Sequence, residues 1–108
     1  MLIYDGGCGF CRRSLRWAYA AGGRFDAVPN AEVDPEPLGL TRPELEEALW
    51  WVGPDDELHR GHDAIAQVLE TSRWVPVRAA GRLVGSPVVA PVARRSYAWV
   101  AANRSRLP

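Results

Sequence analysis

The chain has 108 residues, of which 47% are hydrophobic and 24% are charged, and thirteen basic residues balance thirteen acidic ones. This composition is ordinary for a globular protein and excludes a disordered chain, a collagen-like repeat and a coiled coil. The length suits one hydrophobic core, so we expect a single domain over residues 1–108.

The chain opens with a predicted strand, helix and second strand. Residues 1–4, "MLIY", are apolar and lead into a glycine-rich turn, as a short buried strand does. A helix is predicted from Cys11 onward, because apolar residues recur at helical spacing until Gly22 and Gly23, which suit a helix end. Residues 24–30, "RFDAVPN", indicate a second strand. The helix is then a crossover, so the two strands are predicted to pair in parallel.

The middle of the chain predicts a loop, a helix and a hairpin. Residues 30–40 are rich in proline and acidic residues, which is typical of a loop. Thr41 and Glu44 have the spacing of a capping box, so a helix is predicted to begin there. Aromatic and aliphatic residues then indicate strands over residues 50–52 and 58–60, joined by a Gly-Pro-Asp-Asp turn.

Helices are predicted for most of the remainder. Asp63 can cap a helix that begins at residue 64 and continues as "AIAQVLETS". Residues 74–85 fit either a hairpin or a helix, and periodicity alone leaves both open. A last helix is predicted from Ser86 as its cap to the end of the chain, with a proline at its first position.

The predicted order is βαβαββα followed by a C-terminal helical extension. This is the order of a thioredoxin-like α/β fold, with a mixed four-strand sheet and helices on both faces. In that arrangement the two cysteines stand where the first strand passes into the first helix.

Charge is distributed unevenly along the chain. Residues 1–25 carry one acid and four arginines, and residues 26–70 carry twelve acids and two arginines. Residues 71–108 carry seven arginines and no acid. The last two blocks either face each other, meet a partner of opposite sign, or form two solvated faces, which is the usual reason for such runs.

Cys8 and Cys11 are the two cysteines of the chain and form a C-x-x-C motif. A close pair of this kind in a reducing compartment is more often catalytic or metal-binding than structural. At the start of a helix, unpaired backbone N–H groups and the helix dipole favour the thiolate, which is the form that attacks disulfides. Cys8 is therefore the predicted nucleophile, and Cys11, one helical turn deeper, is predicted to resolve the mixed disulfide.

Asp5 is the third candidate site residue, because it ends the first strand close to where the resolving thiol must lose its proton. Its carboxylate can act as a general base there if it is buried. Alternatively it accepts backbone N–H groups of the turn and the first helical residues, and the two roles are compatible. Exchange between thiols and disulfides requires no cofactor and no metal ion, and none is expected.

The segment "YDGGCGFCRRSLRW" resembles the signature of the DCC family of thiol-disulfide oxidoreductases, which is named for one aspartate and two cysteines. "GHDAI" at residues 61–65, the hairpin before it and "SYAWVAANR" at residues 96–104 resemble further segments of that family. The resemblance implies a thioredoxin-like fold and a helical structure for residues 74–104. It also implies that the named motif positions are Asp5, Cys8 and Cys11.

Two positions depart from the pattern of similar proteins. Family members commonly have proline directly after the first cysteine, where this chain has Gly9. Thioredoxins place a cis-proline before the third strand, whereas no proline directly precedes Trp50. Gly9 therefore leaves the redox potential open, and the docking of substrate backbone is expected to differ from that of thioredoxin.

Two other classes of function fit parts of the sequence. His59 and His62 could join the two cysteines in a Cys2His2 zinc site, although their spacing is unlike that of small zinc fingers. A thioredoxin-shaped binding module could instead use the arginine-rich C-terminal helix, with Tyr97 and Trp99, to dock on an acidic protein or an anionic membrane face.

The expected partners are proteins or small molecules that carry thiols or disulfides. Nucleic acid is not expected, because the basic residues form no recognised binding motif. No apolar run is long enough to span a bilayer and no secretory leader is recognised, so we expect no stable membrane insertion and a cytoplasmic location.

Overall fold

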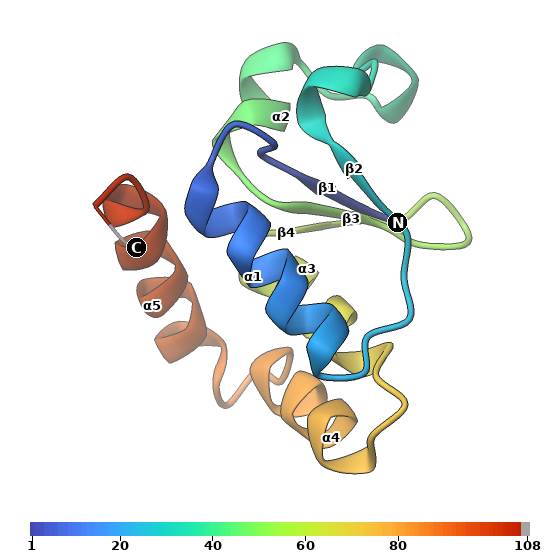
Figure 1. The fold of residues 1–108 in the computed structure, drawn as a ribbon, viewed down its shortest axis with the longest axis vertical. Coiled ribbons are helices and arrows are strands. Elements are labelled where there is room, and N and C mark those ends of the chain that lie inside the picture. Colours follow the sequence, from blue (N-terminus) through green and yellow to red (C-terminus); the bar gives the residue numbers. More distant parts are fainter. Residues whose placement is uncertain (107–108) are drawn as a thin grey trace.

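The computed structural model describes residues 1–106, which form four strands, five α-helices and two 3-10 turns (Figure 1). In chain order these are β1 (Leu2–Tyr4), α1 (Gly9–Ala20), β2 (Ala27–Pro29), η1 (Asn30–Glu32), η2 (Glu36–Leu38), α2 (Arg42–Glu47), β3 (Trp50–Val52), β4 (Leu58–Arg60), α3 (His62–Glu70), α4 (Val75–Val84) and α5 (Ala90–Asn103). The predicted strands over 50–52 and 58–60 are confirmed to the residue.

The four strands form one mixed sheet in the order β2-β1-β3-β4. β1 and β2 pair in parallel, because α1 carries the chain back to the end of the sheet where β1 began. β3 is antiparallel to β1, and β4 is antiparallel to β3. The predicted thioredoxin-like order with a C-terminal helical extension is thus confirmed.

Helices cover both faces of the sheet. α2 and the two 3-10 turns lie on one side, whereas α1 and α3 lie on the other (Figure 1). On the α2 side, Ile3, Leu45 and Trp50 form the buried core. Side chains alternate along a strand, so Leu2, which is also buried, faces the opposite helices. The sheet therefore separates two apolar layers.

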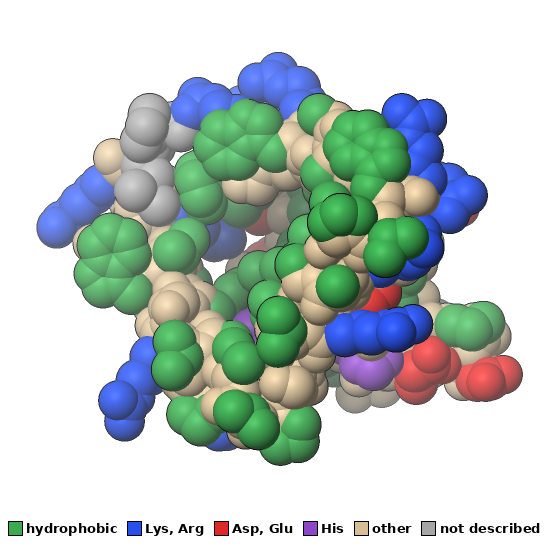
Figure 2. Space-filling view, turned by 90° about the horizontal axis from the view of Figure 1, so that it is seen from below, with side chains coloured by type: hydrophobic (Ala, Val, Ile, Leu, Met, Phe, Trp, Pro, Cys, Tyr) green, Lys and Arg blue, Asp and Glu red, His purple; other side chains and the backbone are tan. Residues whose placement is uncertain are grey.

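The C-terminal helices pack unequally against the rest of the chain. Gly81 of α4 lies so close to α3 that an added Cβ would be 2.8 Å from the carbonyl oxygen of Ala66. In contrast, no residue of α1 or α5, both of which the structure describes in full, is completely buried. Figure 2 shows a hollow on the face that α4 and α5 help to form, with hydrophobic side chains around it and arginines towards the periphery.

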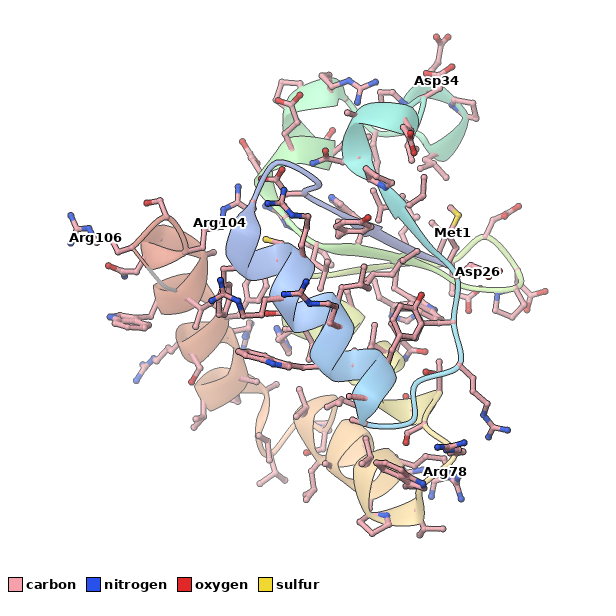
Figure 3. All side chains as sticks on the ribbon, in the orientation of Figure 1. Met1, Asp26, Asp34, Arg78, Arg104 and Arg106 are labelled. Atoms are coloured by element: carbon pink, nitrogen blue, oxygen red, sulfur yellow. The ribbon has the colours of Figure 1, made fainter. Side chains whose placement is uncertain are left out.

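One residue of the acidic block and one of the basic block lie far apart in the molecule. Asp34 of the acidic block lies at one end, and Arg78 of the basic block lies at the opposite end (Figure 3). Among residues 1–106, no salt bridge joins the acidic block 26–70 to the basic block that follows it. Among these residues, the two charged blocks therefore form no ion pairs with each other.

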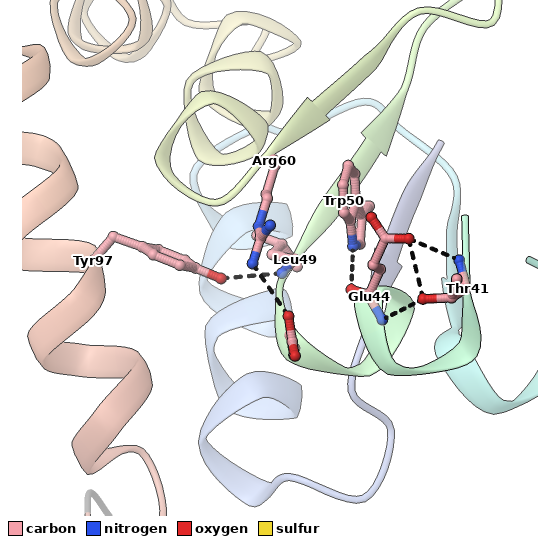
Figure 4. Close-up of polar contacts among 7 residues, drawn as sticks. Thr41, Glu44, Leu49, Trp50, Arg60 and Tyr97 are labelled. Carbon is pink, nitrogen blue, oxygen red and sulfur yellow. Dashed lines mark hydrogen bonds and ion pairs between the residues drawn. The ribbon is translucent and has the colours of Figure 1, made fainter. Parts of the chain in front are cut away.

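Two polar arrangements join neighbouring elements (Figure 4). The predicted capping box is present, since the N–H of Glu44 donates to Thr41 Oγ1 (3.3 Å) and the N–H of Thr41 donates to Glu44 Oε1 (3.0 Å). Trp50 Nε1 donates to the Glu44 carbonyl, which satisfies the buried indole. Farther along the chain, the N–H of Leu49 donates to the hydroxyl of Tyr97 (3.0 Å), so α5 is anchored beside the start of β3.

The structure decides one alternative that the sequence left open and corrects one local prediction. Residues 75–84 form α4, so of the two structures left open the helix is the observed one. Asp63 does not cap α3, because Gly61 holds that position with a φ of 62°, which a glycine adopts without strain.

The boundaries of β2 and α5 also differ from the prediction. β2 is shorter than residues 24–30, because Phe25 leaves the strand to stack on Tyr19 with ring centroids 4.5 Å apart. Ser86 caps a turn, and α5 begins only at Ala90. The predicted end of the last helix, residues 107–108, lies outside the described residues.

The close approach of α4 to α3 gives a first test. Gly81→Ala is expected to destabilise the protein, because the new Cβ would lie 2.8 Å from the Ala66 oxygen and 2.9 Å from the Glu70 nitrogen. Both are backbone atoms, so one helix must shift, and overpacking of this kind typically costs about 1–3 kcal/mol. Urea unfolding measures the change.

Gly9→Ala provides the matched control for that experiment. An added Cβ at Gly9 meets only the far end of the Arg12 side chain, at 3.9 Å. Alanine should therefore be tolerated there without loss of stability. A Gly81→Ala protein as stable as the Gly9→Ala protein would contradict the close α3–α4 contact.

Candidate functional site

The C-x-x-C pair lies at the start of α1. Cys8 is the N-cap of this helix, and its Sγ accepts a hydrogen bond from the N–H of Cys11 (3.3 Å). N-cap side chains normally satisfy one of the free N–H groups at the beginning of a helix, and here a sulfur does so. Both cysteines are free thiols, partly buried, with the Cys8 sulfur directed towards the first turn of the helix.

The turn before Cys8 is held by Asp5. The Asp5 carbonyl accepts from the N–H of Cys8 (3.2 Å), and its Oδ1 accepts from the N–H of Gly7 (3.0 Å). Gly6 is needed for close approach, because an added Cβ would meet Pro29 of β2 at 3.0 Å. The expected acceptance of turn N–H groups by the Asp5 carboxylate is therefore observed.

Arg104 joins the site from the other end of the chain. Its Nη2 forms an ion pair with Asp5 Oδ2 (3.2 Å), and its Nη1 donates to Cys11 Sγ (3.9 Å). Figure 3 shows Arg104 at the side of the molecule where α1 begins. The sequence interpretation assigned no role to Arg104, and its place in the closing Asn-Arg pair of "SYAWVAANR" was the available signal.

The two thiols have different surroundings. Burial raises the pKa of Cys11 to about 12, and the hydrogen bond and charge of Cys8 contribute in the same direction. The charge of Asp5 also raises the pKa of Cys11, whereas the charge of Arg104 lowers it. Cys11 is therefore a neutral thiol at neutral pH.

A cavity of about 470 Å3 opens beside Cys8. Its walls come from the turn after β1, the first turn of α1 and the residues that follow α5. They include Asp5, Cys8, Phe10, Arg13 and Arg104. A disulfide that enters this cavity would meet the Cys8 sulfur in a polar, partly positive setting.

The histidines do not join the cysteines. His59 lies in β4 opposite Trp51, and His62 is the first residue of α3, where its Nε2 is 3.2 Å from Asp63 Oδ1. The side chain of His62 is only 12% exposed. Residues 1–106 contain no group of three or more His, Cys, Asp or Glu that could hold a metal ion, so the Cys2His2 set does not converge.

The sequence model of the DCC1-like thiol-disulfide oxidoreductases matches residues 2–108. The chain belongs to this family. No curated protein and no solved structure matches the chain. Membership of the DCC1-like family supports a thiol-disulfide function in general and agrees with the thioredoxin-like sheet.

One feature of this DCC1-like protein concerns Gly9, which is the first residue of α1. Proline suits this position of a helix, because its missing N–H has no partner there in any case. The structure thus explains why a proline after the first cysteine is compatible with the fold, and Gly9 leaves this turn less constrained.

Within residues 1–106, no helix is long and apolar enough to cross a membrane.

Differential labelling tests the two environments. We expect iodoacetamide to modify Cys8 first at neutral pH, since Cys11 keeps its proton until the pH approaches about 12. Mass spectrometry of the reduced protein after brief labelling measures the modified fraction of each cysteine. The same protein in urea is the control, because both thiols are then exposed and should react at similar rates. Equal labelling of the two thiols in the folded protein would contradict the assigned environments.

Proposed function

We propose that this protein is a thiol-disulfide oxidoreductase in which Cys8 attacks a substrate disulfide and Cys11 resolves the mixed disulfide. The observation that carries this proposal is the hydrogen bond from the N–H of Cys11 to Cys8 Sγ at the start of α1, beside an open cavity. A thiolate at Cys8 would be stabilised by this N–H and by the helix dipole. Membership of the DCC1-like family supports the same class of reaction.

The reaction proceeds by two exchanges. The Cys8 thiolate attacks one sulfur of the substrate, a Cys8–substrate disulfide forms, and the other substrate sulfur leaves as a thiolate. Cys11 then loses its proton and attacks Cys8 Sγ, so a Cys8–Cys11 disulfide forms and the second substrate sulfur leaves. The substrate has gained two electrons, and a dithiol reductant must return two electrons to the protein. The reverse sequence oxidises a substrate dithiol.

Asp5 and Arg104 serve the second exchange. Cys11 has a high pKa in the resting protein, so its proton must be removed as it attacks. We assign this proton to the Asp5 carboxylate, whose charge acts on Cys11 and whose Oδ2 pairs with Arg104. The guanidinium of Arg104, 3.9 Å from Cys11 Sγ, stabilises the thiolate that develops there.

The cavity beside Cys8 is compatible with peptide or small-molecule disulfides. Its volume of about 470 Å3 is within the usual range of ligand sites, and its walls are polar and apolar in similar measure. Arg13 and Arg104 would favour substrates with negative charge near the disulfide. No cofactor takes part in this scheme.

Cysteine variants test the order of the two exchanges. Cys8→Ser should lower the rate of disulfide reduction by more than about a hundredfold, because the attacking sulfur is lost. Cys11→Ser should still attack but accumulate a mixed disulfide with glutathione disulfide, which mass spectrometry detects as a stable adduct on Cys8. Ser105→Ala is a matched control, since Ser105 lines the same cavity without a thiol. An adduct on Cys11 in the Cys8→Ser protein, at the rate seen for Cys11→Ser, would reverse the assignment.

Asp5→Asn separates two effects of the carboxylate. The negative charge of Asp5 raises the pKa of Cys11, so its removal should speed the alkylation of Cys11. If Asp5 accepts the proton during resolution, the same variant should slow release of the mixed disulfide by about a hundredfold, at the lower end of general-base contributions. Stopped-flow measurement of thiol release gives the second rate. Asp63→Asn, an exposed acid on α3, is the control, and faster resolution in Asp5→Asn would exclude the base.

A further inference from the structure

A second, larger cavity borders the first. It has a volume of about 750 Å3 and lies between α1, α3, α5 and the end of α4, with Leu2 and Tyr4 of the sheet on one side. Its walls are mostly apolar and include Leu15, Ala18, Ile65, Val68, Val92 and Val100. This cavity is distinct from the polar cavity beside Cys8, although Asp5, Phe10 and Arg104 border both.

The inward sides of α1 and α5 border this cavity. This explains why neither helix, each described over its full length, has a completely buried residue. Apolar side chains that line a cavity lose the contacts that close packing would give, and the few polar groups in these walls offer ordered water little hydrogen bonding. The volume is that of a site for a small apolar or amphiphilic molecule.

The surroundings of the cavity are positively charged. Figure 2 shows the hollow on this face with hydrophobic side chains around it and arginines farther out. Trp17 and Val92 line the cavity and are 58% and 65% exposed, so the apolar lining continues to the surface. Arg16 adjoins Trp17 on α1, and Arg94 and Arg95 follow Val92 on α5.

Among residues 1–106, none of Arg16, Arg94 and Arg95 forms a salt bridge with an acidic side chain. Their charge is therefore available to a ligand. An apolar cavity that opens among arginines complements a molecule with an apolar chain and a negatively charged head.

We propose that this cavity binds a single-chain anionic amphiphile, such as a long-chain carboxylate, with its chain against the apolar walls and its head among the arginines. The binding does not depend on the redox reaction. Cys11 and Arg104 border the same cavity, so the inner end of the ligand's hydrocarbon chain would lie near the thiol of Cys11.

Tryptophan fluorescence can measure this binding directly. A brominated long-chain carboxylate, added below its critical micelle concentration, should quench part of the tryptophan fluorescence and saturate at one molecule per chain, because Trp17 lines the cavity. The methyl ester of the same acid should bind at least about tenfold more weakly, since it lacks the charge. Absence of saturable quenching, or equal binding of the ester, would overturn the proposal.

Bulky substitutions in the cavity lining test whether the ligand binds there. Ala93→Phe adds bulk to the cavity from α5, and Ala98→Phe is the matched control on the same helix outside the cavity lining. Ala93→Phe should weaken binding at least about tenfold and leave the thermal midpoint unchanged or higher, because the new ring fills space between apolar walls. Ala98→Phe should bind as the wild type does. Ala18→Phe adds the same bulk from α1, which keeps the test decisive if Ala93→Phe fails to fold.

Lipid vesicles test whether the bound hydrocarbon chain comes from a free amphiphile or from a membrane lipid. The wild-type protein should bind phosphatidylglycerol vesicles, measured by its depletion from solution, much more weakly than it binds the free carboxylate. The reason is that the proposed site takes one hydrocarbon chain. If the Ala93→Phe and Ala18→Phe proteins bind both the carboxylate and the vesicles as the wild type does, then both ligands adsorb to the arginine-rich surface. The cavity is then not the binding site.

Discussion

The contact of Arg104 with Asp5 and Cys11 connects the two ends of the chain. Arg104 follows α5 and reaches the turn after β1, where it pairs with Asp5 Oδ2 and donates to Cys11 Sγ. The other oxygen of Asp5 accepts from Gly7, so one carboxylate holds both the turn before Cys8 and the C-terminal helix. Without this contact, α5 would retain the hydrogen bond between Tyr97 and Leu49 as its polar link to the sheet. The same contact of Arg104 therefore both fixes the position of α5 and forms part of the surroundings of Cys11.

The two thiols differ because the helix places them differently. Cys8 precedes the first turn, where the N–H of Cys11 donates to its sulfur. Cys11 lies one turn later, and its burial is the largest cause of its high pKa. In the proposed reaction, Cys11 would remain protonated until Cys8 has formed a mixed disulfide, whose sulfur Cys11 can then attack. The same separation of roles is what an ordered exchange requires.

Local signals in the sequence were enough to predict the hairpin strands and the start of α2. The capping box at Thr41 and the hairpin strands around the Gly-Pro-Asp-Asp turn depend on neighbouring residues alone, and both were confirmed. Periodicity could not decide between helix and hairpin for α4, because its burial depends on contact with α3, which no local pattern contains. The start of α5 was misplaced for a similar reason, since Ser86 and Pro87 fit a helix start but cap only a turn.

The sequence placed Asp5, Cys8 and Cys11 within one short segment, but it could not show what surrounds them. Arg104 reaches the site only through tertiary packing, as does the apolar cavity between α1 and α5. The Asp5–Arg104 pair is about one-third exposed on each side, and such pairs contribute at most about 1 kcal/mol. Because so weak a contact shields Cys11, a small displacement of α5 would expose the thiol and remove the burial that keeps it protonated. Because α5 has no completely buried residue, it is the element whose displacement would expose the sulfur that we propose as the resolving one.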